Sequence, residues 1–141
     1  MSSPEVNKLL SFALYGAANR LVRMHKPFLE PLGLTFPQYL VMLELLGGVP
    51  RPVGDLGTRL GMDTGTITPL VKRLEQAGLV KRRRDRDDER RVLVELTESG
   101  LALRERVWAV SSQIDTACQI SSERASELRE ALESVGRLRA D

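Results

Sequence analysis

The sequence has too few cysteines and histidines for two common kinds of site. Its single cysteine, Cys118, leaves no disulfide within the chain, and its single histidine, His25, leaves no cluster with the spacing of a zinc site. We expect neither a metal nor another cofactor. No stretch approaches the roughly 18 consecutive apolar residues of a membrane span, and the N-terminal MSSPEVNKLL lacks the features of a secretory signal. The sequence therefore predicts a cytoplasmic protein with no membrane partner.

Patterns that indicate catalysis are lacking as well. There is no Gly-rich phosphate loop, no convincing order of nucleophile, base and acid, and no metal cluster. We therefore do not expect an enzyme and assign no catalytic residue. A chain of 141 residues that is 42% hydrophobic suits one domain, so residues 1–141 are expected to form a single unit.

The chain has little net charge overall, and its net positive charge is concentrated in one segment. The whole chain carries a net charge of +2, whereas KRRRDRDDERR at 81–91 holds seven basic and four acidic residues, a net charge of +3. A basic patch on a nearly neutral body indicates a polyanionic partner.

Apolar residues recur at helical spacing near both ends of the chain. The first such segment, from about Pro4 to Pro31, has one face formed by Leu10, Leu14, Ala17, Leu21, Met24 and Phe28. After Thr97, a plausible helix cap, the repeat runs through Leu103, Val107, Val110, Ile114 and Ala117, and after Ser121 through Leu128, Leu132, Val135 and Leu138. These helices suit a dimerisation layer, and the alternative is a core within one chain.

The segment between them begins with two further helices. Thr35 is suited to cap a helix that has Pro37 in its first turn and ends at the two glycines 47–48. VPRPV at 49–53 is then expected to be a turn. A short helix follows, with Val53, Leu56 and Leu60 on one face.

MDTGTITPLVKRLEQAG at 62–78 is the most informative stretch. Ile67, Leu70, Val71 and Leu74 form a stripe at i, i+3, i+4 and i+7, Asp63 is a candidate N-cap, and Gly78 is a candidate stop. Pro69 implies either a bend in the helix or a helix that starts later, with Thr68 as its cap and Pro69 as its first residue. With the preceding short helix this makes a helix-turn-helix, whose hydroxyls and cations suit DNA. The alternative is an ordinary helical hairpin with a solvated polar face.

The charged segment lies directly after this helix. LVKRRR and RRVLVELT resemble two antiparallel strands around a charged tip, that is, a wing beside a recognition helix. Asp88 is placed to pair with Arg90 and hold the tip in shape. The alternative is a hairpin whose charges only keep it in solution. The residues expected at the DNA interface are Asp63, Thr64, Gly65, Thr66, Thr68, Pro69, Lys72, Arg73, Arg84, Arg86, Asp88 and Arg90.

The stretch from 55 to 100 resembles the central region of the MarR family of transcriptional regulators. The D-x-R of the wing is present as Asp88-Glu89-Arg90, and LT-x-x-G follows as Leu96, Thr97 and Gly100. The N-terminal half, LSFALYGAANRLVRMHKPFLEPLGLTFPQYLVML, is similar to the organic hydroperoxide resistance branch of that family.

The resemblance implies a mainly α fold with a small β-hairpin wing. A winged helix-turn-helix lobe would span about 35–97, and dimerisation helices would span about 4–31 and 98–139. It further implies a homodimer that represses transcription from a pseudo-palindromic operator in double-stranded DNA. If the protein is instead a module that binds other proteins, its affinity should not depend steeply on salt.

One position departs from the branch. Ser11 in LSFALY stands where the branch has its peroxide-sensing cysteine, and serine cannot be oxidised as a thiol is. Three explanations stay open: a relative released by a small aromatic or carboxylate ligand, an engineered Cys-to-Ser form of a peroxide sensor, or sensing by Cys118. The residues that the resemblance places in the ligand or sensor pocket are Ser11, Tyr15, His25, Phe36 and Tyr39.

Overall fold

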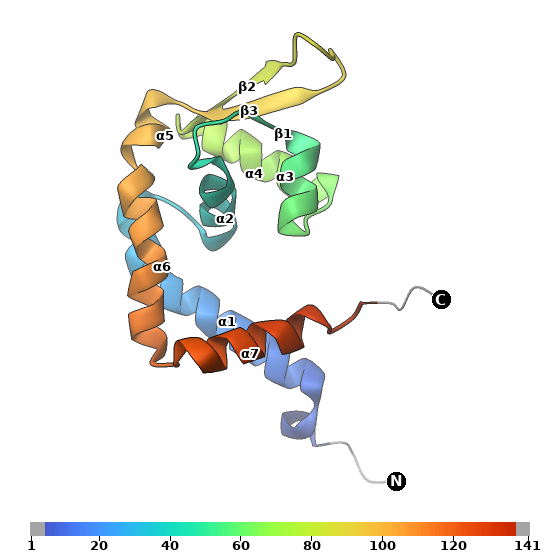
Figure 1. The fold of residues 1–141 in the computed structure, drawn as a ribbon, viewed down its shortest axis with the longest axis vertical. Coiled ribbons are helices and arrows are strands. Elements are labelled where there is room, and N and C mark those ends of the chain that lie inside the picture. The colour runs from blue at the N-terminus through green and yellow to red at the C-terminus, as the bar shows by residue number, and fades with distance from the viewer. Residues whose placement is uncertain (1–4, 138–141) are drawn as a thin grey trace.

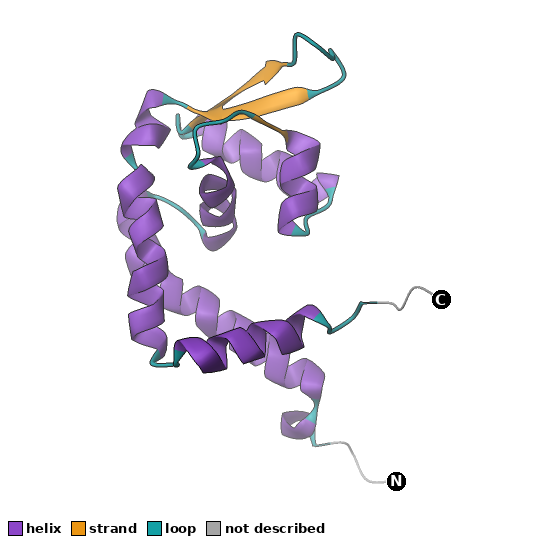
Figure 2. Ribbon diagram, in the orientation of Figure 1, coloured by secondary structure: helices purple, strands orange, loops and turns teal. Residues whose placement is uncertain are grey.

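A computed structural model of the chain describes residues 5–137, which form a mainly helical protein with one small sheet (Figures 1 and 2). In chain order its elements are η1 (Val6–Lys8), α1 (Leu10–Leu29), η2 (Glu30–Leu32), α2 (Phe36–Leu45), β1 (Arg51–Pro52), α3 (Val53–Leu60), α4 (Thr64–Gln76), β2 (Val80–Arg84), β3 (Val92–Leu96), α5 (Glu98–Ala102), α6 (Arg104–Cys118) and α7 (Ser122–Glu133). This is the fold class expected from the sequence.

The sheet has three antiparallel strands in the order β1-β3-β2. The expectation that 49–53 is only a turn is wrong, because Arg51 pairs with Val94 and adds β1 to the hairpin. Arg51 is held further by its Nε, which donates to the carbonyl of Glu44 at 2.9 Å. Pro52 is tolerated in β1 because an edge strand does not need every N–H for pairing.

The helices at the two ends begin and end differently from the expectation. Pro4 lies outside the described residues, and α1 begins only at Leu10, after extended backbone at Leu9. The helix expected after Thr97 is divided at Leu103 into α5 and α6. The last helix follows Ser121 as expected, with the Ser121 side chain as its cap, but α7 ends at Glu133, so Val135 follows the helix, and Leu138 lies outside the described residues.

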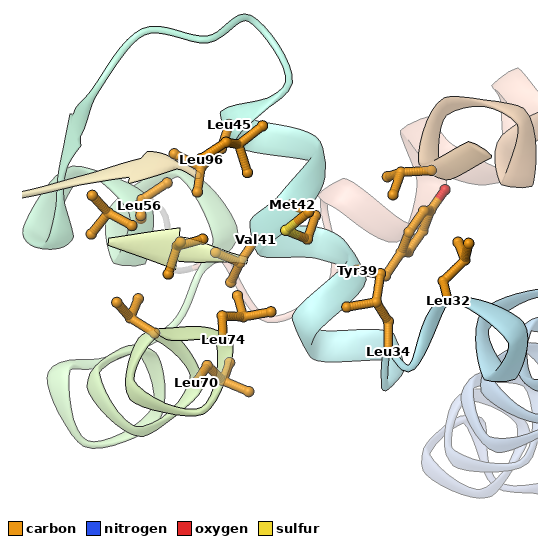
Figure 3. Close-up of a cluster of buried hydrophobic side chains, with 14 of the residues drawn as sticks. Leu32, Leu34, Tyr39, Val41, Met42, Leu45, Leu56, Leu70, Leu74 and Leu96 are labelled. Atoms are coloured by element: carbon orange, nitrogen blue, oxygen red, sulfur yellow. The ribbon is translucent and has the colours of Figure 1, made fainter. Parts of the chain in front are cut away.

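One side of helix α2 packs into the core of the winged lobe, and the other side contacts the long helices α1 and α6. Thr35 begins it with a capping box, in which Thr35 and Gln38 each accept a hydrogen bond from the other's backbone N–H. Figure 3 shows Val41 on the side of α2 that faces Leu74, whereas Tyr39 lies on the other side. Helix α2 therefore links the lobe to the rest of the chain.

The winged lobe and the two terminal helices occupy opposite ends of the molecule, and α6 runs between them (Figure 1). Val107, Val110 and Ile114 of α6 are buried, so this helix joins the core within one chain, whereas α7 buries no residue. Among residues 5–137 no helix combines the length and hydrophobicity needed to cross a membrane.

Candidate nucleic-acid interface

Helix α4 is held in the lobe by one face and presents polar residues on the others. The Asp63 carboxylate caps it by accepting from the backbone N–H of Thr66 at 2.9 Å, as expected. Ile67, Leu70, Val71 and Leu74 are all buried. The remaining positions face outward, and the exposed ones are Thr64, Gly65, Thr66, Pro69, Lys72, Arg73 and Gln76.

Pro69 lies inside α4, which is continuous from Thr64 to Gln76. The alternative of a helix capped by Thr68 and starting at Pro69 is therefore wrong. A proline at this position has no N–H to donate to the carbonyl of Gly65, four residues earlier. Gly65 and Pro69 are both exposed, so α4 lacks this hydrogen bond on its solvent-facing side.

The turn before α4 is tight because two backbones approach each other there. Gly61 ends α3 with a φ of 68°, and the N–H of Met62 returns to the carbonyl of Gly57 at 2.8 Å. A Cβ at Gly57 would lie 2.7 Å from the carbonyl oxygen of Met62, so this position requires glycine. The α3-turn-α4 unit is the helix-turn-helix that the sequence indicated.

The hairpin β2–β3 forms the wing, and Figure 1 shows it at the same end of the molecule as α3 and α4. Its tip, residues 85–91, is closed by backbone hydrogen bonds, including that from Arg91 to Asp88 at 2.9 Å. The expected pairing of Asp88 with Arg90 is confirmed, since Arg90 Nε lies 3.3 Å from Asp88 Oδ1. The Arg90 side chain is 92% exposed even so.

Most cations of the wing already have a partner within the chain. Lys81 and Arg83 lie 3.7 and 3.3 Å from Glu95 on the outer face of the hairpin. Arg84 donates to the carbonyl of Glu89 at 2.8 Å, and Arg91 lies 3.8 Å from Asp85. Within residues 5–137, no ion pair or side-chain hydrogen bond involves Arg86, Lys72 or Arg73.

One contact between α4 and the wing was not anticipated from the sequence. Glu75 near the end of α4 accepts hydrogen bonds from the guanidinium and the backbone N–H of Arg82 in β2. The hydrogen bonds from Arg82 hold the pKa of Glu75 below its usual range. Side chains alternate between the two faces of a strand, so the sequence places about half of the cations of β2 on one face, but nothing in the spacing identifies Glu75 as the partner of Arg82.

Between α4 and the wing lies an open hollow of about 520 Å³. Thr64 and Thr68 line it from α4, and Arg82, Arg90 and Arg91 line it from the wing. The threonine hydroxyls on one wall and the exposed guanidinium group of Arg90 on the other can receive a sugar-phosphate backbone.

The structure brings together three of the five residues expected in the ligand or sensor pocket. The ring centroids of His25 and Phe36 are 4.7 Å apart and those of His25 and Tyr39 are 5.7 Å apart. His25 is buried, and its Nδ1 lies 2.8 Å from the carbonyl oxygen of Leu21. Burial and then the Asp115 carboxylate raise the pKa of Tyr39. Ser11 and Tyr15 are exposed at the far end of α1, at least ten residues before His25, and are not part of this cluster.

Two hollows lie near these residues. One of about 360 Å³ is lined by Arg23, Lys26 and Phe36, among others. The other, about 560 Å³ and mostly apolar, lies between α1, α6 and α7, where it is lined by Leu21, Leu128 and the half-buried Cys118. Among the described residues, no group of three or more His, Cys, Asp or Glu side chains is arranged to hold a metal ion.

Comparisons with known proteins identify relatives along most of the chain. The model of the SarA/Rot transcriptional regulators matches residues 23–107. The organic hydroperoxide resistance transcriptional regulator of Bacillus subtilis is 39% identical over 123 residues, which cover 87% of this chain and 84% of that protein.

Two solved structures share the fold. A probable transcriptional regulator from Pseudomonas aeruginosa is 30% identical with a TM-score of 0.80, covering 92% of this chain and 98% of that one. AbfR of Staphylococcus epidermidis, solved in its reduced form bound to DNA, is 31% identical with a TM-score of 0.75, covering 88% and 86%.

Proposed function

The chain belongs to the MarR/SarA family of winged-helix transcriptional regulators, and we propose that it binds an operator in double-stranded DNA as a homodimer and represses transcription until a small molecule releases it. A regulator of this kind acts where the chromosome is, so we place it in the cytoplasm. The observation that carries the proposal is the position of the polar side of α4 beside a cationic wing, at one end of the molecule.

In this proposal α4 enters the major groove and the wing reaches the neighbouring minor groove or backbone. Thr64, Thr66, Lys72 and Arg73 act from α4, and all four are exposed. Asp63 contributes as the cap that fixes the start of α4, and Gly65, Thr68 and Pro69 shape the surface that follows it.

At the wing, Arg86 is the main phosphate or minor-groove contact, because the tip carries it without an internal partner among the described residues. Arg90 extends from the same tip, and Asp88 holds it in place. Arg84, which is exposed at the end of β2, contributes from the strand.

The homodimer is supported by apolar side chains that one chain leaves uncovered. Leu10, Phe12 and Tyr15 of α1 and Leu128 and Leu132 of α7 are all exposed. A group of exposed apolar side chains on neighbouring helices is typical of a protein–protein interface. A second copy that covers α1 and α7 would also account for a helix, α7, that buries nothing within its own chain.

The proposed signal is an aromatic or carboxylate ligand bound close to Phe36. The hollow of about 360 Å³ has a size found among ligand sites, and Arg23 supplies a cation for a carboxylate, as does Lys26 if the ligand replaces the Glu30 carboxylate that lies 3.8 Å from it in the same hollow. His25 and Tyr39 pack against Phe36 and do not line the hollow themselves. Ser11 and Tyr15 would join the site only if α1 of a second subunit brought them there. The competing thiol mechanism would require Cys118, because Ser11 has no thiol.

The test is fluorescence anisotropy of a duplex from the protein's own upstream region, at two or more salt concentrations. Specific binding with log affinity falling steeply against log salt, by roughly 0.9 for each phosphate contact, is the expected result. Adding an aromatic carboxylate should release the duplex, whereas an organic hydroperoxide should not. Release by peroxide that a thiol reverses would replace the ligand mechanism with sensing at Cys118, and salt-independent binding would contradict a DNA-binding function.

A further inference from the structure

We infer that Glu75 and Arg82 form a brace that fixes the wing against the recognition helix, so that Arg82 is a positioning residue and does not contact phosphate. This inference rests on the proposed function. It concerns the one ion pair in residues 5–137 that joins α4 to the hairpin.

The geometry ties a helix to the backbone of a strand. Glu75 Oε1 accepts from Arg82 Nε at 3.1 Å and from its terminal nitrogen at 3.0 Å. Glu75 Oε2 accepts from the backbone N–H of Arg82 at 3.1 Å. Because both the side chain and the main chain of β2 are bound, a shift of the wing relative to α4 must break all three hydrogen bonds.

The position of β2 makes this tie important. In the order β1-β3-β2 the strand lies at the edge of the sheet, so its outward N–H groups have no strand partner. On α4, helical spacing places Glu75 on the same side as Thr64 and Thr68, which is the side lining the hollow below the wing. Glu75 therefore supplies the acceptor that the edge of β2 lacks.

The pairing with Glu75 also means that Arg82 is not available to bind DNA phosphate. Both side chains are about one third exposed, in contrast to the almost fully exposed Arg90. Charge-assisted, forked hydrogen bonds of this kind are the strong ones in proteins, and the low pKa of Glu75 reflects them. Arg82 would have to leave Glu75 to reach a phosphate.

Two roles of the Glu75–Arg82 pair predict opposite effects of Glu75→Gln on DNA affinity: the pair either positions the wing or keeps Arg82 from binding a phosphate. If the pair positions the wing, the variant lets the hairpin move, and base pairs under the wing lose their influence on affinity. If Arg82 is held away from a phosphate that it would otherwise bind, the variant frees one cation in each subunit of the homodimer, so affinity rises and the salt dependence becomes steeper by roughly 1.8.

The experiment uses full-length protein and a duplex that the parent selects from a random-sequence pool. Affinity is measured for that duplex and for versions substituted either at the base pairs under α4 or at the flanking base pairs under the wing, as located by footprinting. We call the fold-loss of affinity caused by substituting the base pairs under the wing the flank penalty. For Glu75→Gln we expect about a tenfold loss of affinity for the selected duplex. We also expect its flank penalty to fall to nearly onefold, whereas the loss caused by substitutions under α4 should equal that of the parent. Arg82→Lys should lower the flank penalty in the same direction but by less, because lysine keeps the charge and the backbone hydrogen bond and loses only the two hydrogen bonds of the guanidinium group.

Glu95→Gln is the matched control. It removes a carboxylate that also pairs with wing cations, Lys81 and Arg83, but on the outer face of the hairpin. Its flank penalty should equal that of the parent. Circular dichroism and thermal unfolding establish that each variant is folded, and Arg82→Lys, which retains the backbone hydrogen bond to Glu75, serves if Glu75→Gln does not fold.

Three outcomes would overturn the brace. The first is tighter binding by Glu75→Gln with a steeper salt dependence. The second is an unchanged flank penalty in both variants. The third is a flank penalty lost equally in Glu95→Gln. A parent protein that selects no duplex from the pool contradicts the proposed function itself and takes the inference with it.

Discussion

Gly100 shows how one residue can fix the distance between two elements. A Cβ there would lie 2.1 Å from the carbonyl oxygen of Leu79, in the backbone between α4 and β2. Thr97 holds the same junction, because its hydroxyl donates to the carbonyl of Gly78 at 2.6 Å and accepts from the N–H of Gly100 at 3.1 Å. The LT-x-x-G motif is thus explained by packing behind the wing, not by contact with a ligand.

Gly100→Ala is therefore expected to destabilise the protein. The added methyl group must displace backbone, which typically costs about 1–3 kcal/mol of unfolding free energy. Urea unfolding monitored by circular dichroism measures the change. Gly54→Ala is the control, because a Cβ at Gly54 in α3 meets nothing within 4 Å and alanine favours a helix. Equal stability of the Gly100→Ala variant and the parent would show that α5 can move away from Leu79 at no cost.

The pKa of Glu75 gives a second prediction at the residue scale. Its folded-state pKa lies below the ordinary value of 4.5, chiefly because of hydrogen bonds from Arg82. The stabilisation by this group is therefore complete above pH 4.5 and is lost as pH falls through the folded-state pKa. In urea unfolding, the parent should exceed Glu75→Gln in stability at pH 7, and the difference should shrink below pH 4.5. A difference that is constant down to pH 3 would contradict the lowered pKa.

The wing leads to a prediction at the scale of an element. Arg86→Ala should reduce the slope of log affinity against log salt by roughly 1.8, because the homodimer loses one phosphate contact, worth roughly 0.9, in each of its two subunits. Arg90→Ala should also weaken operator binding, and binding as tight as that of the parent would show that the wing assignment is wrong. Lys8→Ala removes the same charge from exposed η1, at the opposite end of the molecule, and should leave the slope unchanged.

Elements that form because of interactions between residues close together in the sequence were predictable from the sequence. The caps at Thr35, Asp63 and Thr97 and the buried stripe of α4 follow from nearest neighbours along the chain, and the structure confirms them. Features that depend on distant partners were not predictable. β1 exists because β3 is beside it, and the brace between Glu75 and Arg82 depends on how β2 turns back onto α4.

The candidate DNA interface and the pocket show the same difference between features set by local sequence and features set by distant partners. Spacing alone identified the polar side of α4 and the pair of Asp88 with Arg90, but it did not distinguish cations that are paired inside the wing from Arg86. The pocket set taken from the family resemblance divides within one chain into a buried cluster around His25 and two exposed residues, Ser11 and Tyr15. That division is what a site completed by a second chain would look like from one subunit.

At the scale of the whole molecule, one chain is an incomplete structure. Its winged lobe has a closed core, whereas α1 and α7 expose Leu10, Phe12, Leu128 and Leu132. We expect light scattering at micromolar concentration to give twice the 15.7 kDa of one chain. Two lobes would then be held so that their recognition helices meet successive major grooves roughly 34 Å apart, which requires a pseudo-palindromic operator.

Leu10→Glu tests this arrangement without disturbing the core. Leu10 is 65% exposed in the single chain, so the carboxylate costs little there, but burying it against a partner should raise the dimer dissociation constant at least about tenfold. Operator affinity should fall with it, because a single lobe retains only half of the contacts. Val49→Glu, at an equally exposed apolar site in the lobe, should leave the dimer intact. A parent protein that scatters as a monomer, or a Leu10→Glu variant that stays dimeric, would mean that α1 does not form the dimer interface.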